Sequence, residues 1–302
     1  MSYPILQVTE RSLPADYDGP IFIWDVDKTY LDTDFKSLWG LLRIPLEMAI
    51  DKTIIPGTAA TLQECRRGPG DRPVHTPIYF VSASPPQLAG VIRRKMLLDG
   101  LQPDGFLFKD QAKLALCGRF RELKFQVEYK LTAHWSLIVD LPPGARLVVV
   151  GDDWESDGHV FHLLDATQRG DLAGADLAAA LRDAGVDRSS IEPMVSLAAR
   201  ATGRAQVDLA CVILTKGRDP SYFDPYRPIV HAAREALQAA ALFADRRLVS
   251  PDGVARVAWR LRADWGWTAQ QVESSLADLT ARSLVSDALM DQVREALGQE
   301  NV

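Results

Sequence analysis

Short apolar runs that end in polar residues recur along the first two thirds of the chain. Residues 21–24, 78–81 and 147–150 each form four consecutive, largely apolar positions. Runs of this kind are typical of strands buried on both faces of a sheet. A later run, residues 209–214, has the same character. The pattern predicts four strands of one buried sheet.

The segments between these runs have helical spacing or helix boundaries. We expect a helix over residues 35–50, a second over "TAATLQECRR" after Pro56 and Gly57, and a third after Pro85 and Pro86. A fourth is expected within "KFQVEYKLTAHWSLIVDLPPG". Strands that alternate with helices predict an α/β fold, a doubly wound parallel sheet with helices on both faces.

The composition changes twice along the chain. Residues 1–19 are polar and contain proline, which is typical of a lead-in segment. After about residue 218 comes the turn-rich connector "GRDPSYFDPYRP", and residues 229–302 are rich in Ala, Arg and Leu. We therefore expect an α/β domain over residues 19–218 and a helical C-terminal region over residues 219–302.

The overall composition narrows the class of protein. The chain has 302 residues, of which 47% are hydrophobic and 25% charged, as in a soluble globular protein. A net charge of −6 argues against a general nucleic-acid binder. Cys65, Cys117 and Cys211 include no C-x-x-C pair, which argues against a thiolate zinc site and a disulfide framework. With no signal-peptide pattern and no long apolar run, we expect a cytoplasmic protein without a transmembrane segment.

Polar side chains gather where three of the predicted strands end. The clusters are Asp25 with Asp27, Ser82 with Ser84, and Asp152 with Asp153 and Asp157. Ligands of such sheets bind at the carboxyl ends of the strands. Unpaired carboxylates are costly to bury, and Mg²⁺ prefers oxygen ligands. We therefore expect Asp25, the backbone carbonyl of Asp27 and Asp152 to bind Mg²⁺.

These clusters resemble the motifs of a known superfamily. "DVDKT" resembles the D-x-D-x-T motif of the haloacid dehalogenase (HAD) superfamily of phosphatases, and "IYFVS" resembles its second motif. Lys130 suits the lysine of the third motif, and "VVVGDDWESD" resembles the fourth, G-D-x-x-x-x-D. "SASPPQL" is similar to the S-x-S-P of the actin-patch-associated phosphatidate phosphatase family. Lys28 and Asp153 depart from that family's usual Gly and Ser.

The resemblance implies a HAD-like Rossmannoid core and a Mg²⁺-dependent phosphatase acting on a phosphate monoester, with phosphatidate-like lipid phosphates as one substrate class. Asp25 would be the nucleophile, Asp27 the general acid and base, and Lys130 the cation between nucleophile and phosphate. The expected substrate contacts are Thr29, Ser82 and Ser84 and, outside the family pattern, Lys28. The implied metal ligands are Asp25, Asp27, Asp152 and Asp157, with Asp153 as a further candidate.

Several alternatives remain open at this point. Ser84 could instead start a turn or cap a helix, and Lys28 could meet a second negative charge of the substrate or extend into water. His159 and His162 could share a helix face as metal ligands or serve as ordinary helix residues. "RVAWRLRADWGW" could pack on the core, make a peripheral membrane contact or touch nucleic acid. For the whole chain, the alternatives are a non-catalytic scaffold of the same fold and a nucleic-acid end-processing phosphatase.

Overall fold

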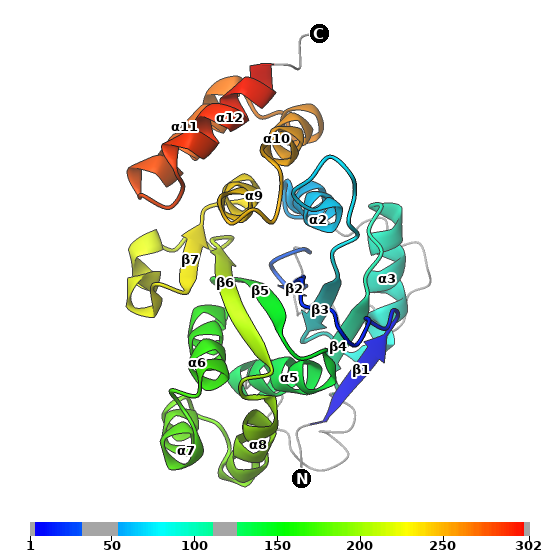
Figure 1. The fold of residues 1–302 in the computed structure, drawn as a ribbon, viewed down its shortest axis with the longest axis vertical. Coiled ribbons are helices and arrows are strands. Elements are labelled where there is room, and N and C mark those ends of the chain that lie inside the picture. The colour runs from blue at the N-terminus through cyan, green and yellow to red at the C-terminus, as the bar shows by residue number, and fades with distance from the viewer. Residues whose placement is uncertain (1–3, 32–53, 111–125, 299–302) are drawn as a thin grey trace.

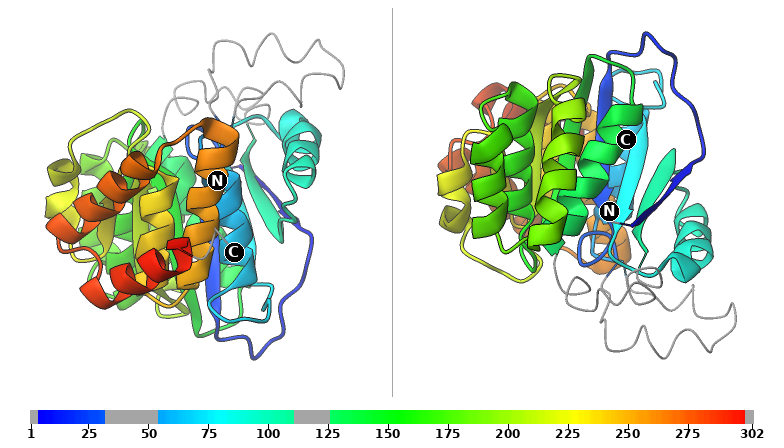
Figure 2. Two further views of the ribbon diagram at one scale, coloured as in Figure 1. Left: turned by 90° about the horizontal axis from the view of Figure 1, so that it is seen from above. Right: turned by 90° about the horizontal axis from the view of Figure 1, so that it is seen from below.

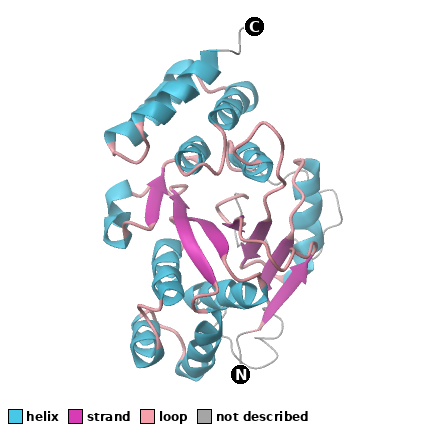
Figure 3. Ribbon diagram, in the orientation of Figure 1, coloured by secondary structure: helices cyan, strands magenta, loops and turns pink. Residues whose placement is uncertain are grey.

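A seven-stranded sheet runs through the centre of the molecule (Figures 1 and 3). The computed structural model describes residues 4–31, 54–110 and 126–298. The strand order is β1-β4-β3-β2-β5-β6-β7, and β1 alone pairs antiparallel, along β4. The strands are β1 (Ile5–Thr9), β2 (Pro20–Asp25), β3 (Ile78–Ser82), β4 (Gly105–Lys109), β5 (Ala145–Asp152), β6 (Ala205–Ile213) and β7 (Val230–Ala233).

Successive side chains of the central strands point to opposite faces, and both faces are buried. In β2, Phe22 and Trp24 belong to one hydrophobic core, and Ile21 and Ile23 belong to the other. The same alternation holds in β5 and β6. Burial on both faces explains why these strands are continuous apolar runs instead of alternating patterns.

Helices cover each face of the sheet (Figures 1 and 2). The first core is covered by α2 (Thr58–Arg67), α3 (Ala89–Leu98), α9 (Ala236–Asp245) and α10 (Pro251–Trp265), with α11 (Ala269–Ala281) and α12 (Asp287–Gly298) packed outside. The second core is covered by α5 (Gln126–Asp140), α6 (Asp157–Arg169), α7 (Gly174–Asp183) and α8 (Arg188–Ala201). Two short 3₁₀ helices, η2 (Pro86–Leu88) and η4 (Pro220–Tyr226), lie in loops.

The order of the strands reverses between β2 and β5. From β2 the chain adds β3 and then β4 on one side, and it crosses to the other side of β2 to form β5, β6 and β7. The helices before the crossing cover one face, and α5 to α8 cover the other. A crevice opens at the carboxyl ends of the strands at such a reversal, and ligands of doubly wound sheets bind there.

The structure confirms the predicted α/β class, with a mostly parallel sheet. The predicted strands become β2, β3, β5 and β6, and α2, α3 and α5 match predicted helices. The lead-in expected over residues 1–19 contains an edge strand, β1, which was not predicted, and β4 was not predicted either. The helix expected over residues 35–50 lies outside the described residues.

The chain after residue 218 contributes a strand as well as helices. β7 pairs parallel with β6, although a purely helical region was expected there. β7 was not predicted because it has only four residues, "VHAA". Three of them, the histidine and the two alanines, are not typical strand formers. The segment "RVAWRLRADWGW" lies mostly in α10, which buries Val254, Val257 and Leu261 in the first core. Helices in the described ranges all fall short of the length and apolarity that crossing a bilayer needs.

Candidate metal centre

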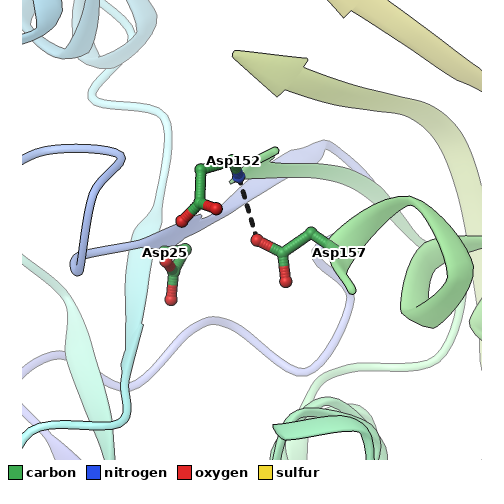
Figure 4. A group of neighbouring side chains, drawn as sticks. All are labelled: Asp25, Asp152 and Asp157. Carbon is green, nitrogen blue, oxygen red and sulfur yellow. Dashed lines mark hydrogen bonds between the residues drawn. The ribbon is translucent and has the colours of Figure 1, made fainter. Parts of the chain in front are cut away.

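Three aspartates meet near the carboxyl ends of β2 and β5 (Figure 4). Asp25 is the last residue of β2, Asp152 the last of β5, and Asp157 the first of α6. One carboxylate oxygen from each lies within 4.8 Å of the others, and all three side chains are buried. The strand ends thus bring together residues that are separated by up to 132 positions in the chain.

Gly151 allows the third aspartate to approach the strand. A Cβ atom at this position would lie 2.1 Å from Oδ2 of Asp157, far inside van der Waals contact. The same oxygen accepts a hydrogen bond from the backbone N–H of Asp152 at 2.9 Å. Asp157 also lies in the first turn of α6, where the helix dipole favours a negative charge. The glycine is therefore required by the position of Asp157.

Lys130 is the cation of the centre. It lies on α5, and its Nζ contacts Asp157 directly, Glu155 at 2.8 Å and Asp25 at 3.6 Å. Asp152 adds a further carboxylate to the group. Four carboxylates thus face one ammonium, which leaves an excess of three negative charges when all are ionised.

Burial and the crowding of acids shift the pKa values of the centre. Burial raises the pKa of Asp152 to about 7, and Asp157 adds to the rise while Lys130 opposes it. Burial likewise raises the pKa of Asp25 well above its usual range and raises that of Glu155. Burial alone would lower the pKa of Lys130, but the attraction of Asp157, Asp25 and Glu155 prevails and holds it well above normal. The lysine is therefore charged at neutral pH.

The donor set fits a hard divalent cation. Oδ1 of Asp25 is buried and accepts no hydrogen bond from the part of the chain that the structure describes. A buried carboxylate oxygen that accepts no hydrogen bond is costly even with Lys130 at 3.6 Å, and so is the excess of negative charge. A cation among Asp25, Asp152 and Asp157 would relieve both costs. The ligands are all oxygen, as Mg²⁺ prefers, and neither His159 nor His162 belongs to the group found in the described residues.

Asp27 lies beside the cluster but makes a different set of contacts. Its carboxylate accepts hydrogen bonds from the hydroxyls of Ser82 at 2.8 Å and Ser84 at 2.9 Å. The amide of Ser84 in turn donates to the Ser82 hydroxyl at 3.1 Å. The N-terminus of η2 is capped by Pro85 with no side-chain hydrogen bond, so Ser84 does not cap this helix. The second cluster of polar residues thus fixes the orientation of the second aspartate.

Thr29 joins the two strand ends. Its hydroxyl lies 3.3 Å from Oδ2 of Asp25 and 3.4 Å from Oδ2 of Asp152, and the side chain is fully buried. The threonine can therefore hold the two carboxylates in register. Direct contact of Thr29, Ser82 or Ser84 with a substrate stays a prediction.

Asp153 points away from the centre. Its two carboxylate oxygens accept hydrogen bonds from the backbone amides of Lys216 at 2.7 Å and Arg218 at 2.8 Å. It is not among the clustered carboxylates of the described residues, so the structure favours Asp157 over Asp153 as the third ligand. Asp153 lies just past the end of β5, and its two amide contacts direct its side chain to the loop after β6.

Lys28 lies in the loop after β2 with an unusual backbone. Its φ angle is 61°, in the left-handed region that favours glycine. The side chain lies over the ring of Trp154, with Nζ 4.9 Å from the ring centroid. The positive φ is consistent with the glycine that the resembling family has here.

The remaining candidates pack outside the centre. His159 and His162 lie on α6 beside the ring of Tyr226, with ring centroids 6.1 Å and 5.6 Å apart. In η4, Phe223 is buried in the second core, whereas Tyr222 is half exposed. Tyr226 packs partly against the same core.

Two residues of the centre were not predicted as such. Glu155 contacts Lys130, and its place within the acidic motif, two residues before Asp157, was the available signal. Tyr129 directly precedes the predicted lysine. Its hydroxyl accepts a hydrogen bond from the backbone N–H of Ser82 and donates to the carbonyls of Ser82 and, at 2.7 Å, Leu107. It joins β3 to β4 below the site, and no pattern in the sequence marks it.

Comparison of the chain with protein-family models, with curated proteins and with solved structures found no match.

Proposed function

We propose that the chain is a HAD-type, Mg²⁺-dependent phosphatase that hydrolyses a phosphate monoester through an aspartyl-phosphate on Asp25. One observation carries the proposal. The buried Asp25, whose Oδ1 accepts no hydrogen bond from the described residues, lies at the strand ends with Asp152, Asp157 and the charged Lys130. This group supports phosphoryl transfer, because it combines a nucleophile, a cation site and a fixed positive charge at one place.

In the first step, a carboxylate oxygen of Asp25 attacks phosphorus and the bond from phosphorus to the leaving oxygen breaks. Asp27 gives its proton to that oxygen, so the product leaves as an alcohol. The hydroxyls of Ser82 and Ser84 hold the Asp27 carboxyl in one orientation beside Asp25. The positive charge of Lys130, 3.6 Å from Asp25, reduces the repulsion between the carboxylate and the phosphate.

In the second step, water attacks phosphorus and the bond between phosphorus and Asp25 breaks. Asp27, now a carboxylate, takes a proton from this water, which restores both aspartates and releases inorganic phosphate. Asp25, Asp152 and Asp157 would hold the Mg²⁺. When bound, the ion neutralises part of the phosphate charge. Thr29 keeps Asp25 and Asp152 in register during both steps.

The test is a phosphatase screen of the purified chain with Mg²⁺ and with chelator. The panel contains a generic aryl phosphate and lipid, sugar, nucleotide and nucleic-acid phosphates. We expect Mg²⁺-dependent release of phosphate from at least one class. Asp25→Asn should remove it, while Asp183→Asn, an exposed aspartate at the end of α7, should not.

Two results would contradict the proposal. Turnover that persists in excess chelator would exclude the metal role of the three aspartates. Turnover equal in wild type and Asp25→Asn would place the chemistry elsewhere. Preference for a nucleic-acid end over every small phosphate would instead favour the end-processing alternative.

A further inference from the structure

Two lysines flank one exposed tryptophan beside the metal centre. The ammonium of Lys28 lies 4.9 Å, and that of Lys216 5.4 Å, from the centroid of the Trp154 ring. The Trp154 side chain is 45% exposed. We call these three residues the lysine–tryptophan rim. It is built from the loops after β2, β5 and β6, the strands that carry or flank the acidic centre.

The rim is attached directly to the proposed metal ligands. The backbone N–H of Trp154 donates to Oδ1 of Asp152 at 2.5 Å. Lys28 follows Asp25 by three residues in a loop that closes on itself through Lys28 N–H and the carbonyl of Leu31 at 2.8 Å. The loops that carry the rim are therefore the same loops that follow the proposed metal ligands on β2 and β5.

Hydrogen bonds fix the loop that carries the second lysine. The Thr215 hydroxyl donates to the Lys28 carbonyl at 3.0 Å, which ties the β6 loop to the β2 loop. Asp153 accepts from the amides of Lys216 and Arg218 and ties the same loop to the end of β5. The Arg218 side chain is used in this anchoring, since Nε donates to the Asp153 carbonyl at 2.8 Å and the guanidinium lies over Tyr222. Lys216 is exposed and lies over Trp154.

The rim brings two positive charges to one exposed ring, and each cation–π contact with that ring stabilises by about 0.5–1 kcal/mol. Lys28 also adopts a left-handed backbone that costs a non-glycine residue about 1–2 kcal/mol. Observed backbone strain of this kind points to a function for the side chain. The charge of the rim is opposite to that of the centre behind it.

We propose that the lysine–tryptophan rim is a subsite for a second phosphate group of the substrate. A phosphate monoester carries about −1.5 to −2 charges at neutral pH and so matches two ammonium groups, whereas a carboxylate carries one. Lys28 and Lys216 would bind the second phosphate while the first reaches Asp25. The inference rests on the proposed phosphatase function and names its substrate class, a small molecule with two phosphate groups.

The experiment compares matched substrates that differ only at the far end. These are alkanediol bisphosphates of increasing chain length, the alkyl monophosphates and the carboxyalkyl phosphates. We expect the wild type to prefer a bisphosphate by about tenfold or more in kcat/KM, mainly through KM. Each of Lys28→Gln and Lys216→Gln should lower this preference about threefold to fivefold, because each removes one charge contact near the surface. Glutamine is used at position 28 because glycine would also relieve the strain of the left-handed backbone.

Control variants separate the rim from general charge and from stacking. Arg200→Gln removes an exposed charge at the end of α8, next to the amino end of β6, and should leave the preference intact. The preference should shrink with added salt. Asp153→Asn should lower it as the lysine variants do, because Asp153 positions Lys216. Equal bisphosphate preference in the wild type and in the double variant Lys28→Gln, Lys216→Gln would overturn the inference.

A stacking role gives a different result. If Trp154→Leu reduces the preference for aryl over alkyl phosphates and the lysine variants change nothing, the rim binds a ring and the phosphate subsite is refuted. Preference for the carboxyalkyl phosphate over the bisphosphate would also refute it.

A binding measurement keeps the inference testable if no phosphate is hydrolysed. The absence of hydrolysis would contradict the proposed function but would not decide whether the rim binds a phosphate. Calorimetric titration with alkane bisphosphonates and monophosphonates, in Mg²⁺, then tests the rim directly. Tighter binding of the bisphosphonate that is lost in the double variant would support the subsite, and equal binding in both proteins would contradict it.

Discussion

Replacement of Lys130 by methionine tests the electrostatics of the centre. Methionine keeps most of the length and volume of the lysine stem, so the change removes mainly the charge. The Lys130 side chain is 2% exposed and contacts Asp157, Glu155 at 2.8 Å and Asp25 at 3.6 Å. Removing one partner of a buried ion pair costs about 3–5 kcal/mol. We expect a loss of this size in the free energy of unfolding without metal.

Metal and protons should both restore part of the loss. Saturating Mg²⁺ stabilises the native state by RT ln(1 + [L]/Kd), which is about 2.7 kcal/mol at a hundredfold excess over Kd. Protonation acts the same way. An acid whose pKa is raised by folding, as for Asp152 at about 7, binds protons more tightly in the native state. Lowering the pH from about 8 to about 5 should therefore narrow the gap between variant and wild type.

The assay is urea unfolding of wild type and Lys130→Met, followed by tryptophan fluorescence, with chelator and with Mg²⁺. Lys216→Met is the matched control, an exposed lysine whose loss should cost less than about 1 kcal/mol. A loss below about 1 kcal/mol for Lys130→Met, unaffected by Mg²⁺ and pH, would refute the charge balance described for the centre.

Three further predictions concern the nucleophile, the metal and the buried histidine. Asp25→Asn should lower turnover at least about 10³-fold with an unchanged circular dichroism spectrum, because an amide is a poor nucleophile; wild-type rates would refute this. Activity should require Mg²⁺ and be inhibited by Ca²⁺, which takes more ligands at longer distances and would hold Asp25 away from phosphorus; full rates with Ca²⁺ alone would contradict it. Burial lowers the pKa of His134 to about 4. The stability gained by keeping it neutral is present above about pH 6.5 and lost as the pH falls toward 4. Urea unfolding across this range should show a smaller acid loss in His134→Asn, and equal losses would exclude the effect.

The central strands and the acidic centre could be predicted because burial leaves a strong pattern. Strands that are covered on both faces are continuous apolar runs. The runs Ile21–Trp24 and Leu147–Val150 therefore show in the sequence where β2 and β5 lie. Aspartates that follow such runs directly lie at the carboxyl edge of the sheet. Parallel pairing of β2 with β5 then brings Asp25 close to Asp152.

The edge strands and the rim could not be predicted, because their residues depend on contacts distant in sequence. β1 is an edge strand with partly exposed side chains, and it lies in a polar segment of the chain. It therefore lacks the continuous apolar run that identifies the central strands. The role of Asp153 depends on the β6 loop, which lies 63 positions later in the chain. Trp154 lies within the same acidic motif, and no pattern in the sequence indicates that two lysines contact its ring.

The most direct test of the central claim is to find the phosphate on Asp25. In Asp27→Asn, an aryl phosphate needs no acid for its leaving group, but water lacks its base, so the phosphoenzyme should accumulate. We expect a burst of one aryl alcohol per protein, and peptide mass spectrometry after acid quenching should find the phosphate on Asp25. A burst with the phosphate on another residue, such as Ser84, or with no phosphate on the protein, would contradict the account.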